Sequence, residues 1–528
     1  MKRVLISDEM SDRALERFRS EQGIQVDYRP GLPAAELRSL IGEYDALIVR
    51  SATKVTAGVL EGATRLQVVG RAGTGLDNVD LEAATRRGIV VMNVPGGNTI
   101  SAAEHTMALL LSLARGVPSA DRSLRAGRWE RGRFVGSELE GKVLGIVGLG
   151  RVGREVASRA AAFHMEVIAH DPFVSAEGAR TGSIPLISLA DLLPRSDFLT
   201  LHVPLTAATR GMIGQKELAS LPRGARLINC ARGGIVDEAA LAKALDSGHL
   251  AGAALDVFAE EPPAQDLPFR GMDQVILTPH LAASTSEAQE KVAVLIADQV
   301  CDYLRDGVAR NAANVTSLDP RQRERAAPYL ELAETLGRCQ GELLEGRLHE
   351  ITVECGGDVP EEALPAVTIA VLKGYLERFL HGPVNAVNAA WLARERGLEL
   401  REVRTRASQD YQNLITTTFR SDQRSRAITG TVFGRNLPRI VALDGFRFDA
   451  LPRGALLLVS NDDRPGIVGR IGTLLGDNRI NIAHMSLGRD HQGGQAIAAI
   501  SVDTQVPPEI AATLQATPGI LWVKSIHL

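Results

Sequence analysis

The sequence predicts a multidomain α/β protein, and three observations support this fold class. The 528 residues correspond to about three or four domains at roughly 150 residues per domain. From residue 4 to residue 278, short β-branched runs alternate with helical stretches, a pattern typical of parallel sheets covered by helices. Residues 455–527 instead follow the order β-α-β-β-α-β, which is typical of a ferredoxin-like fold.

Composition restricts the class of partner. Hydrophobic residues make up 45% of the chain, charged residues 23%, and the formal net charge is −4, so nothing attracts the protein generally to nucleic acid or to an anionic membrane. No run approaches the ~18 apolar residues of a membrane span, and residues 1–8 reach an acid before a signal-type region develops. The four cysteines form no C-x-x-C pair and are expected to be buried apolar side chains. We expect a cytoplasmic protein that binds small molecules.

The first domain is predicted from strand candidates that precede a glycine-rich region. They are Val4–Ser7, Ala46–Arg50, Gln67–Arg71 and Ile89–Val94, with helical stretches at Pro33–Gly42 and Leu81–Arg87. The alternation indicates a mostly parallel sheet in a domain of its own. A long helix follows over Ile100–Ala114, capped near Asn98, and its Met107–Leu111 stretch is expected to be buried.

The central motif is an apolar run, Val143–Val147, that breaks into Gly-x-Gly-x-x-Gly. Gly148 lets the chain turn, Gly150 lets N–H groups approach a pyrophosphate, and Gly153 permits close helix–strand packing. Asp171 ends the next strand, where its carboxylate can accept from a ribose 2′-OH. A glycine-rich turn that binds nothing is the alternative, but the flanking elements and the acid favour a dinucleotide site. The acid also favours NAD over NADP, because it would repel a 2′-phosphate.

Strand candidates continue to alternate with helices on both sides of Asp171. With the strand before the glycine loop they make six, the number in the two mononucleotide-binding halves of a Rossmann-type domain. These candidates are Met165–His170, Phe198–Val203, Arg226–Cys230, Ala253–Phe258 and Val275–Thr278. A helix over Thr285–Leu304 leads to Asn311–Pro320, which is polar, ends in proline and is predicted to be a linker.

Residues 321–452 are predicted to form an α+β domain. Helices are expected over Arg325–Glu345, Ala366–Leu380 and Asn385–Arg396, and strands within Arg424–Ala450. Seven arginines and three aspartates lie between residues 420 and 453. Two interpretations stay open for them, a solvated basic face and a site for a small anion. A second linker near Pro452 precedes the ferredoxin-like tail.

Three residues of complementary chemistry follow predicted strand ends: Arg232, Glu261 and His280. Oxidation of an alcohol with a nicotinamide cofactor needs a base for the hydroxyl proton and a cation for the substrate's carboxylate and carbon–oxygen bond. Each residue also has a plainer explanation, as a helix-flanking cation, a turn acid and a surface histidine. Because the carboxyl ends of parallel strands converge on the ligand site, we predict that the three act together.

The sequence resembles the D-isomer-specific 2-hydroxyacid dehydrogenases. The resemblance rests on the glycine loop with Asp171 and on the segments Asn229–Glu238, Asp256–Pro262 and Thr278–Leu281. Within that family it is similar to the long-form D-3-phosphoglycerate dehydrogenases. This narrower similarity covers essentially the whole chain and includes Arg71–Asn78, Asn98–His105, Asn461–Gly466 and the extra C-terminal domains.

The resemblance implies a domain plan and a quaternary state. Residues 1–98 and 284–315 would form a discontinuous, flavodoxin-like substrate-binding domain, into which the Rossmann-type NAD domain of residues 99–283 is inserted. Residues 316–452 would be an intervening allosteric, anion-binding domain of α+β type. Residues 453–528 would be a ferredoxin-like ACT regulatory domain. A homo-oligomer, either a dimer or a tetramer, and L-serine as effector are also implied.

The family's site roles are carried over to matching positions. Arg232 would hold the substrate's carboxylate and carbonyl, Glu261 would orient its partner, and His280 would be the acid/base. Further implied contacts are Gly148, Leu149, Gly150, Arg151, Val152, Gly153, Asp171, Thr206, Cys230, Ala231, Asp256 and His280 for NAD; Arg50, Ser51, Thr74, Gly75 and Asn98 for substrate; and Asn461, Asp463 and Asn481 for effector. No metal is implied.

Two positions depart from the family pattern. Ala282 stands where glycine commonly follows Pro-His-Leu, and the added methyl is expected to change local packing without abolishing activity. Asn461 stands where a histidine or tyrosine usually contacts the effector. For the other two effector positions a structural role is the alternative, because Asp463 could cap the helix that opens at Gly466 and Asn481 could close a turn.

The implied reaction is NAD-dependent oxidation of 3-phosphoglycerate to 3-phosphohydroxypyruvate, the first step of L-serine biosynthesis. Two alternatives stay open. Another D-2-hydroxyacid dehydrogenase, such as a glyoxylate or hydroxypyruvate reductase, would not explain the regulatory tail. A non-catalytic NAD-sensing protein, as in a family of transcriptional corepressors, would retain similar active-site residues.

Overall fold

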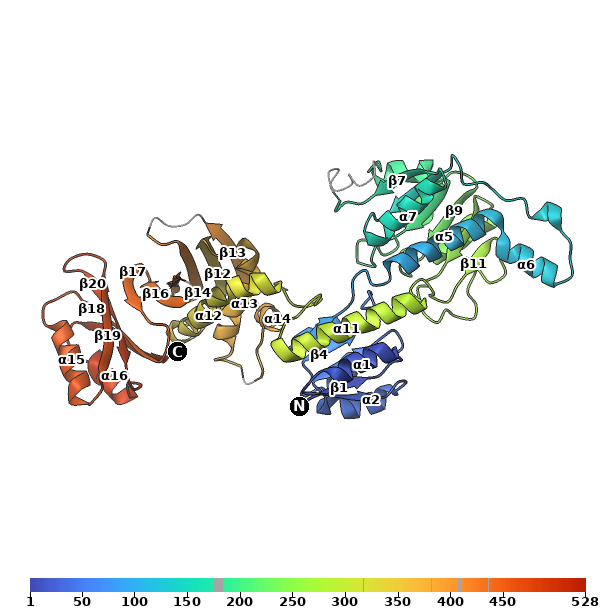
Figure 1. Cartoon of the computed structure of the whole chain (residues 1–528). Coiled ribbons are helices and arrows are strands. Elements are labelled where there is room, and N and C mark those ends of the chain that lie inside the picture. The colour runs from blue at the N-terminus through green and yellow to red at the C-terminus, as the bar shows by residue number, and fades with distance from the viewer. Residues whose placement is uncertain (175–183, 317, 381, 406–409, 435) are drawn as a thin grey trace.

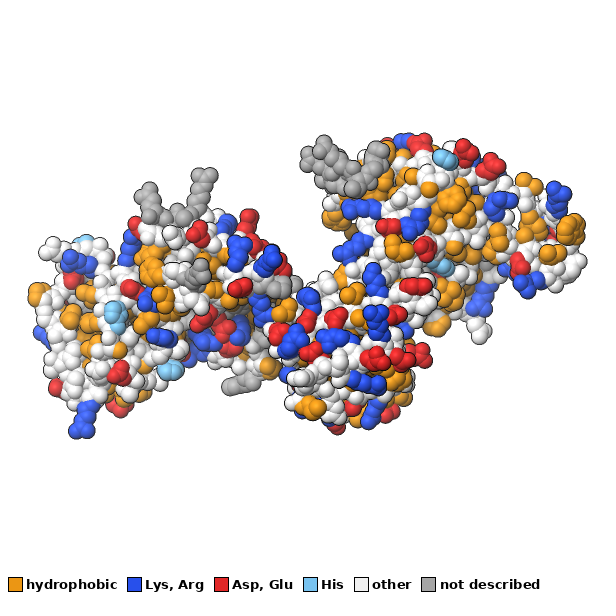
Figure 2. Space-filling view, viewed as in Figure 1, with side chains coloured by type: hydrophobic (Ala, Val, Ile, Leu, Met, Phe, Trp, Pro, Cys, Tyr) orange, Lys and Arg blue, Asp and Glu red, His pale blue; other side chains and the backbone are white. Residues whose placement is uncertain are grey.

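The computed structural model contains four β-sheets that follow one another along the chain (Figure 1). It describes all residues except 175–183, 317, 381, 406–409 and 435. Acidic and basic side chains are interspersed over the face shown in Figure 2, in keeping with the small net charge. The predicted α/β class is confirmed.

The first sheet has the flavodoxin-like strand order β2-β1-β3-β4-β5, with all strands parallel. Its strands are β1 (Lys2–Ile6), β2 (Ile24–Tyr28), β3 (Ala46–Val49), β4 (Val68–Arg71) and β5 (Val90–Met92). Its helices are α1 (Asp12–Ser20), α2 (Ala34–Leu40), the 3-10 turn η1 (Ile41–Glu43), α3 (Ala57–Leu60) and α4 (Leu81–Arg86). Helix α11 (Ser286–Asp306) returns from much later in the chain and buries Val292, Ile296 and Val300 in the same core.

Helix α1 and strand β2 were not predicted from the sequence. Strand β2 is at the sheet edge and has no fully buried residue, so its sequence lacks a strong apolar pattern. Helix α1 buries only Ala14, Leu15 and Phe18, and Ser11 caps it by accepting from the Ala14 N–H. Strand β2 is therefore defined mainly by its pairing with β1, whereas α1 has a local signal in its Ser11 cap.

The second sheet is parallel, in the order β11-β10-β9-β8-β6-β7. Its strands are β6 (Val143–Val147), β7 (Glu166–His170), β8 (Phe198–Leu201), β9 (Ala225–Asn229), β10 (Leu250–Leu255) and β11 (Val275–Leu277). Its helices are α5 (Thr99–Arg115), α6 (Val117–Arg125), η2 (Arg131–Arg133), α7 (Arg151–Ala162), α8 (Leu189–Leu192), η3 (Leu193–Arg195), α9 (Gln215–Ser220) and α10 (Glu238–Asp246). The six predicted strands are confirmed. Beyond β7, where a Rossmann sheet has another strand, one bridge joins Ala169 to Leu186.

Two details differ from the prediction. In α5, Met107 and Leu110 are buried but Ala108 is exposed, because Ala108 lies on the solvent face of an amphipathic helix, four residues after exposed Glu104. The predicted linker is not free around Asn314. Asn314 accepts from the Val91 N–H and donates to the Ile89 carbonyl, which fixes this residue beside β5.

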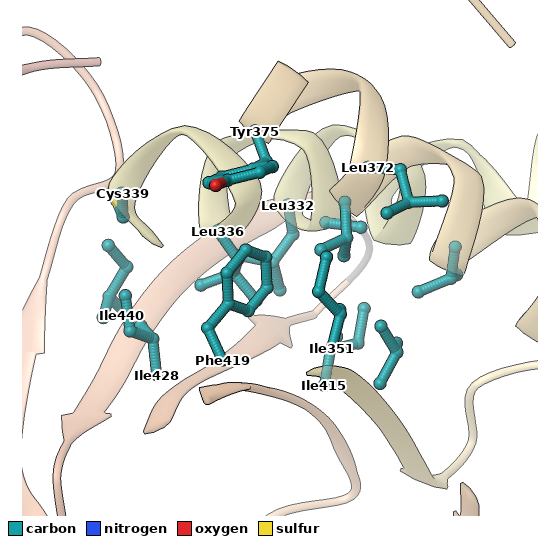
Figure 3. Close-up of a cluster of buried hydrophobic side chains, with 14 of the residues drawn as sticks. Leu332, Leu336, Cys339, Ile351, Leu372, Tyr375, Ile415, Phe419, Ile428 and Ile440 are labelled. Atoms are coloured by element: carbon teal, nitrogen blue, oxygen red, sulfur yellow. The ribbon is translucent and has the colours of Figure 1, made fainter. Parts of the chain in front are cut away.

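The third sheet has the order β13-β12-β14-β15-β16-β17, in which only the β12–β13 pair is parallel. Its strands are β12 (Leu348–Gly357), β13 (Glu399–Thr405), β14 (Asn413–Ser421), β15 (Ser425–Phe433), β16 (Leu437–Leu443) and β17 (Phe446–Ala450). Its helices are α12 (Pro320–Leu343), η4 (Glu361–Ala363), α13 (Leu364–Leu376) and α14 (Ala389–Glu395). Figure 3 shows side chains of α12 and α13 meeting the sheet in one apolar core, where the Tyr375 and Phe419 rings pack edge to face, 5.1 Å between centroids.

Strands β12, β13 and β14 were not predicted. Three consecutive threonines, Thr416–Thr418, lie at the centre of β14, and threonine also favours turns and caps, so the sequence signal is ambiguous. The described arginines of the 420–453 run do not converge. Arg420 pairs with Glu350, Arg439 with Asp449, and Arg426 is buried beside Asp444. Anion binding by this domain stays a prediction.

The fourth sheet has the order β19-β20-β18-β21, and its βαββαβ succession confirms the ferredoxin-like prediction. Its elements are β18 (Ala455–Asp462), α15 (Ile467–Asp477), β19 (Ile482–Arg489), β20 (Gln495–Val502), α16 (Pro508–Gln515) and β21 (Ile520–His527). One face of this sheet contributes Leu456, Leu458 and Ile526 to the core of the third sheet. The two C-terminal sheets therefore share a hydrophobic core.

All four cysteines are free and buried, as predicted from their spacing. Within the described residues, no helix combines the length and the apolarity that crossing a bilayer requires.

Candidate active site

Arg232, Glu261 and His280 come from loops at one edge of the second sheet. They follow β9, β10 and β11, which are parallel neighbours, so their carboxyl ends lie side by side. His280 Nδ1 lies 2.7 Å from Glu261 Oε2. The structure therefore forms the histidine–carboxylate pair that the sequence suggested.

The two partners of this pair shift each other's protonation. The hydrogen bond that His280 donates to Glu261 raises the pKa of His280, and burial and Arg232 oppose the shift only in part. Burial alone would raise the pKa of Glu261, but the bonds from His280 and from the Phe258 N–H hold that pKa below its usual value. Because Nδ1 is engaged by the carboxylate, Nε2 is the atom of His280 left to exchange a proton with a ligand.

Arg232 connects the two N-terminal sheets. Its Nε donates to Asp77 Oδ2 at 3.0 Å, and Asp77 lies in the loop after β4 of the first sheet. A Cβ on Gly75 would overlap Arg232 Nη2, so the absence of a side chain at residue 75 leaves room for the guanidinium group. Asn229, which the site prediction omitted, holds the Arg232 loop by donating to the Arg232 carbonyl and accepting from the Ala231 N–H.

The predicted substrate positions lie at the carboxyl edge of the first sheet. Arg50 follows β3 directly, and its backbone is fixed by Asp8 and Asn78. Ser51 is the next residue and is exposed. Thr74 Oγ1 donates to Asn98 Oδ1 at 2.7 Å, so Asn98 begins α5 without capping it.

Arg71 is a further cation at this edge that the site prediction did not include. Burial lowers its pKa to about 10, and the nearby guanidinium groups of Arg232 and Arg50 contribute to the decrease while Asp77 opposes it. Its Nε is buried and has no hydrogen-bond partner in the described part of the chain. The signal that could have identified it is its position at the end of β4, next to the strand that Arg50 follows. Three guanidinium groups thus gather where an anionic ligand would compensate them.

The glycine loop has the features of a pyrophosphate cradle. Gly148 has a φ of 96°, and a Cβ on Gly153 would overlap the Gly148 carbonyl, which accounts for both glycines. Gly150 begins α7 without a side-chain cap, and a Cβ there would meet no atom within 4 Å. The helix N-terminus is therefore open to an anion. Asp171 accepts from the Leu149 N–H at 2.9 Å, which places its carboxylate beside the loop.

The remaining predicted cofactor positions line the loops after β8, β9 and β10. Thr206 is exposed in a turn closed by Thr209. Cys230 is buried beside Ala231. The Asp256 carboxylate is wholly buried and accepts from the Leu281 and Ala282 N–H groups. Ala282, the departure from the family pattern, is itself buried in the core.

The predicted effector residues lie at opposite ends of the fourth sheet, with Asn461 and Asp463 at the end of β18 and Asn481 before the start of β19. Asp463 does not cap α15, whose N-cap is Gly466 without a side-chain bond; its carboxylate instead accepts from the Gly493 N–H and from Arg489. Asn481 donates to Asp503. Asn461 is buried and its Oδ1 has no partner among the described residues.

Comparison with known proteins identifies the family. Residues 107–282 match the model of the D-isomer specific 2-hydroxyacid dehydrogenase, NAD binding domain, residues 325–444 that of the D-3-phosphoglycerate dehydrogenase intervening domain, and residues 455–519 that of the ACT domain. A D-3-phosphoglycerate dehydrogenase of Archaeoglobus fulgidus is 42% identical over all of both chains. The chain belongs to the D-3-phosphoglycerate dehydrogenase family. That of Bacillus subtilis is 40% identical, again over all of both chains.

Two solved structures resemble the N-terminal part of the chain. The TT0316 protein of Thermus thermophilus superposes with a TM-score of 0.55 at 36% identity, covering 59% of this chain and 99% of that one. A D-lactate dehydrogenase of Aquifex aeolicus, complexed with NAD and lactic acid, gives a TM-score of 0.52 at 27% identity over 59% and 98% of the two chains. The family membership confirms the predictions of an oxidoreductase and of NAD as its cofactor.

Proposed function

We propose that this enzyme oxidises 3-phosphoglycerate to 3-phosphohydroxypyruvate, the first step of L-serine biosynthesis. The observation that carries the proposal is the meeting of the His280–Glu261 pair with Arg50, Arg71 and Arg232. A 2-hydroxy acid that also bears a phosphate has about three negative charges at neutral pH, which suits three guanidinium groups. Full-length relatives named D-3-phosphoglycerate dehydrogenase support this substrate.

The catalytic roles follow from the pair geometry. Arg232 holds the substrate's carboxylate and polarises the carbon–oxygen bond at C2. His280 accepts the C2 hydroxyl proton at Nε2, and the Glu261 carboxylate at Nδ1 stabilises the imidazolium that results. NAD, when bound, supplies the acceptor for the hydride from C2. The open N-terminus of α7 and the Asp171 carboxylate suit its pyrophosphate and its adenosine ribose.

The phosphate is assigned to Arg50 and Arg71, with Ser51, Thr74, Gly75 and Asn98 lining the pocket. Replacing Arg50 with lysine keeps a point charge but removes the planar pair of donors. We expect Arg50→Lys to impair oxidation of 3-phosphoglycerate more than oxidation of an unphosphorylated 2-hydroxy acid. Equal losses on both substrates would place Arg50 outside the phosphate site.

Serine inhibition at the ACT domain requires two chains. Asn481 precedes Ile482, which pairs with Val502, and Val502 pairs with Ala455 at the start of β18. Asp463 follows the other end of β18, on the order of 20 Å away along the sheet. One serine cannot contact both residues in a single chain. We therefore assign the effector site to the junction of two ACT domains in a homo-oligomer, a dimer or a tetramer.

The division into domains follows the four sheets. We assign residues 1–98 and 284–315 to substrate binding, 99–283 to NAD binding, 316–452 to the intervening domain and 453–528 to the ACT domain. Helix α11, which returns to the first sheet, supports the discontinuous first domain. The four free cysteines support a reducing compartment such as the cytoplasm.

The deciding experiment measures NADH formation with 3-phosphoglycerate and with D-lactate as substrates. We expect a much larger kcat/KM for 3-phosphoglycerate. A preference for D-lactate, or for reduction of glyoxylate or hydroxypyruvate, would support another 2-hydroxyacid dehydrogenase. NAD binding with no turnover of any of these compounds would support the corepressor-like alternative.

A further inference from the structure

Asp256 is the anchor of the loop that carries His280. Its carboxylate is completely buried and accepts four hydrogen bonds: from Thr278 Oγ1 at 2.6 Å, from the Leu281 N–H at 2.7 Å, from the Ala282 N–H at 2.9 Å and from His105 at 3.2 Å. The Asp256 carbonyl also accepts from the His280 N–H at 2.9 Å. The loop is therefore tied to one residue on both sides of the proposed acid/base.

His280 needs this support because its backbone is strained. Its φ of 53° lies in the left-handed region, which costs a residue with a Cβ about 1 kcal/mol or more. Such a conformation persists only where the surroundings over-determine it. The imidazole is 45% exposed and Glu261 is its only hydrogen-bond partner among the described side chains, so the loop backbone sets where the ring lies.

His105 reaches this anchor from a different element. It lies in the second turn of α5, and its Nε2 is 3.2 Å from Asp256 Oδ1 and 3.3 Å from Thr278 Oγ1. An ionised carboxylate can only accept, so Nε2 carries the proton and donates. A buried carboxylate is costly unless its acceptor positions are filled, and His105 fills one that the loop does not.

We infer that His105 is a positioning residue for the proposed oxidation. By completing the hydrogen bonds of Asp256, it holds the Thr278–Ala282 loop in the strained conformation that aligns His280 with Glu261. Helix α5 begins directly after Asn98, which bonds Thr74 of the substrate pocket, so the same rigid helix supports both the pocket and the acid/base loop. This inference rests on the proposed function.

The test compares His105→Phe, which keeps the ring shape but lacks the donor, with His105→Gln, whose amide can donate. Misalignment of about 1 Å at a reacting group typically costs about a hundredfold. We expect His105→Phe to lower kcat for 3-phosphoglycerate by about 10- to 100-fold, with KM values for substrate and NAD changed less than about twofold. His105→Gln should restore most of the activity. His249→Phe, which removes a histidine bond to the Leu218 carbonyl in the same domain, is the matched control and should be unaffected.

The pH profile separates positioning from a general loss of folded enzyme. The charged groups that act on His280 are Glu261, Asp256 and Arg232. A loosened loop weakens the bond between His280 and Glu261, so the acid limb of the oxidation profile should move to lower pH in His105→Phe. A smaller fraction of folded enzyme would lower the rate but leave the acid limb at the same pH. Thr278→Val, which removes another donor to the Asp256 carboxylate, should also move the acid limb to lower pH. It serves as the test variant if His105→Phe does not fold.

A second readout does not depend on the substrate. With 13C-labelled histidine, and the His280 signal assigned by its loss in His280→Asn, NMR titration gives the pKa of His280 directly. We expect that pKa to fall in His105→Phe even if 3-phosphoglycerate is not the substrate, so the two proposals fail separately. An unchanged His280 titration in folded His105→Phe and Thr278→Val would overturn the positioning role.

Discussion

Replacing Gly75 with alanine should move Arg232 without disturbing the fold. The φ of Gly75 is not positive, so its backbone accepts a Cβ, but that Cβ would overlap Arg232 Nη2 and lie 2.7 Å from Asp77 Oδ2. Both neighbours are ends of side chains that can yield. To restore a normal contact, the guanidinium must recede by about 1 Å, and a misplacement of this size at a substrate-holding group costs about a hundredfold.

The assay is initial-rate NADH formation together with a thermal melt. We expect Gly75→Ala to lower kcat/KM for 3-phosphoglycerate by about a hundredfold, or about 2.7 kcal/mol of transition-state stabilisation, with little change in Tm. Gly271→Ala is the control, because its Cβ would meet nothing within 4 Å and its φ is not positive. Gly233→Ala should instead lower the Tm, because its Cβ would overlap the Phe258 carbonyl, a backbone group that cannot move aside like the end of a side chain. Kinetics of Gly75→Ala within roughly threefold of the wild type would refute the assigned position of Arg232.

Three further predictions concern the His280–Glu261 pair, the cofactor site and the effector site. Glu261→Gln should lower the pKa of His280 and so move the acid limb of the oxidation profile to lower pH, with a reduced plateau. The Tm should fall most at pH values between the ordinary pKa values of glutamate and histidine, because the stability from the raised His280 pKa is lost as pH rises through that pKa and the stability from the lowered Glu261 pKa is lost as pH falls through that pKa. Asp171→Ala should lower kcat/KM with NAD and raise it with NADP, because the carboxylate beside the Leu149 N–H would repel a 2′-phosphate. An unaltered cofactor preference would show that Asp171 does not contact the ribose. Asp463→Ala should abolish inhibition by serine at near-normal turnover, whereas undiminished inhibition would contradict the effector role.

The elements that local sequence predicted well are those whose burial pattern is strong. The strands of the second sheet are short apolar runs between turn residues, and all six appear. The glycine loop and the strand-end positions of Arg232, Glu261 and His280 followed from the same pattern. Strand β2 was missed because none of its side chains is fully buried, and β14 because three consecutive threonines lie at its centre; both are strands because they pair with neighbouring strands.

What the sequence by itself determined is therefore the kind of protein: an α/β dehydrogenase with a glycine loop, a histidine and a glutamate at neighbouring strand ends, and a ferredoxin-like tail. Only the tertiary structure decided which distant groups meet. Arg71 joins Arg50 and Arg232 because strands β3 and β4 end side by side and the Asp77 loop reaches the second sheet. His105 meets Asp256 across 151 residues of sequence. Asp463 and Asn481 separate because β18 and β19 run in the same direction. Local sequence patterns indicate helices, strands and turns. Contacts between distant segments depend on strand order and on packing, which no short stretch of sequence contains.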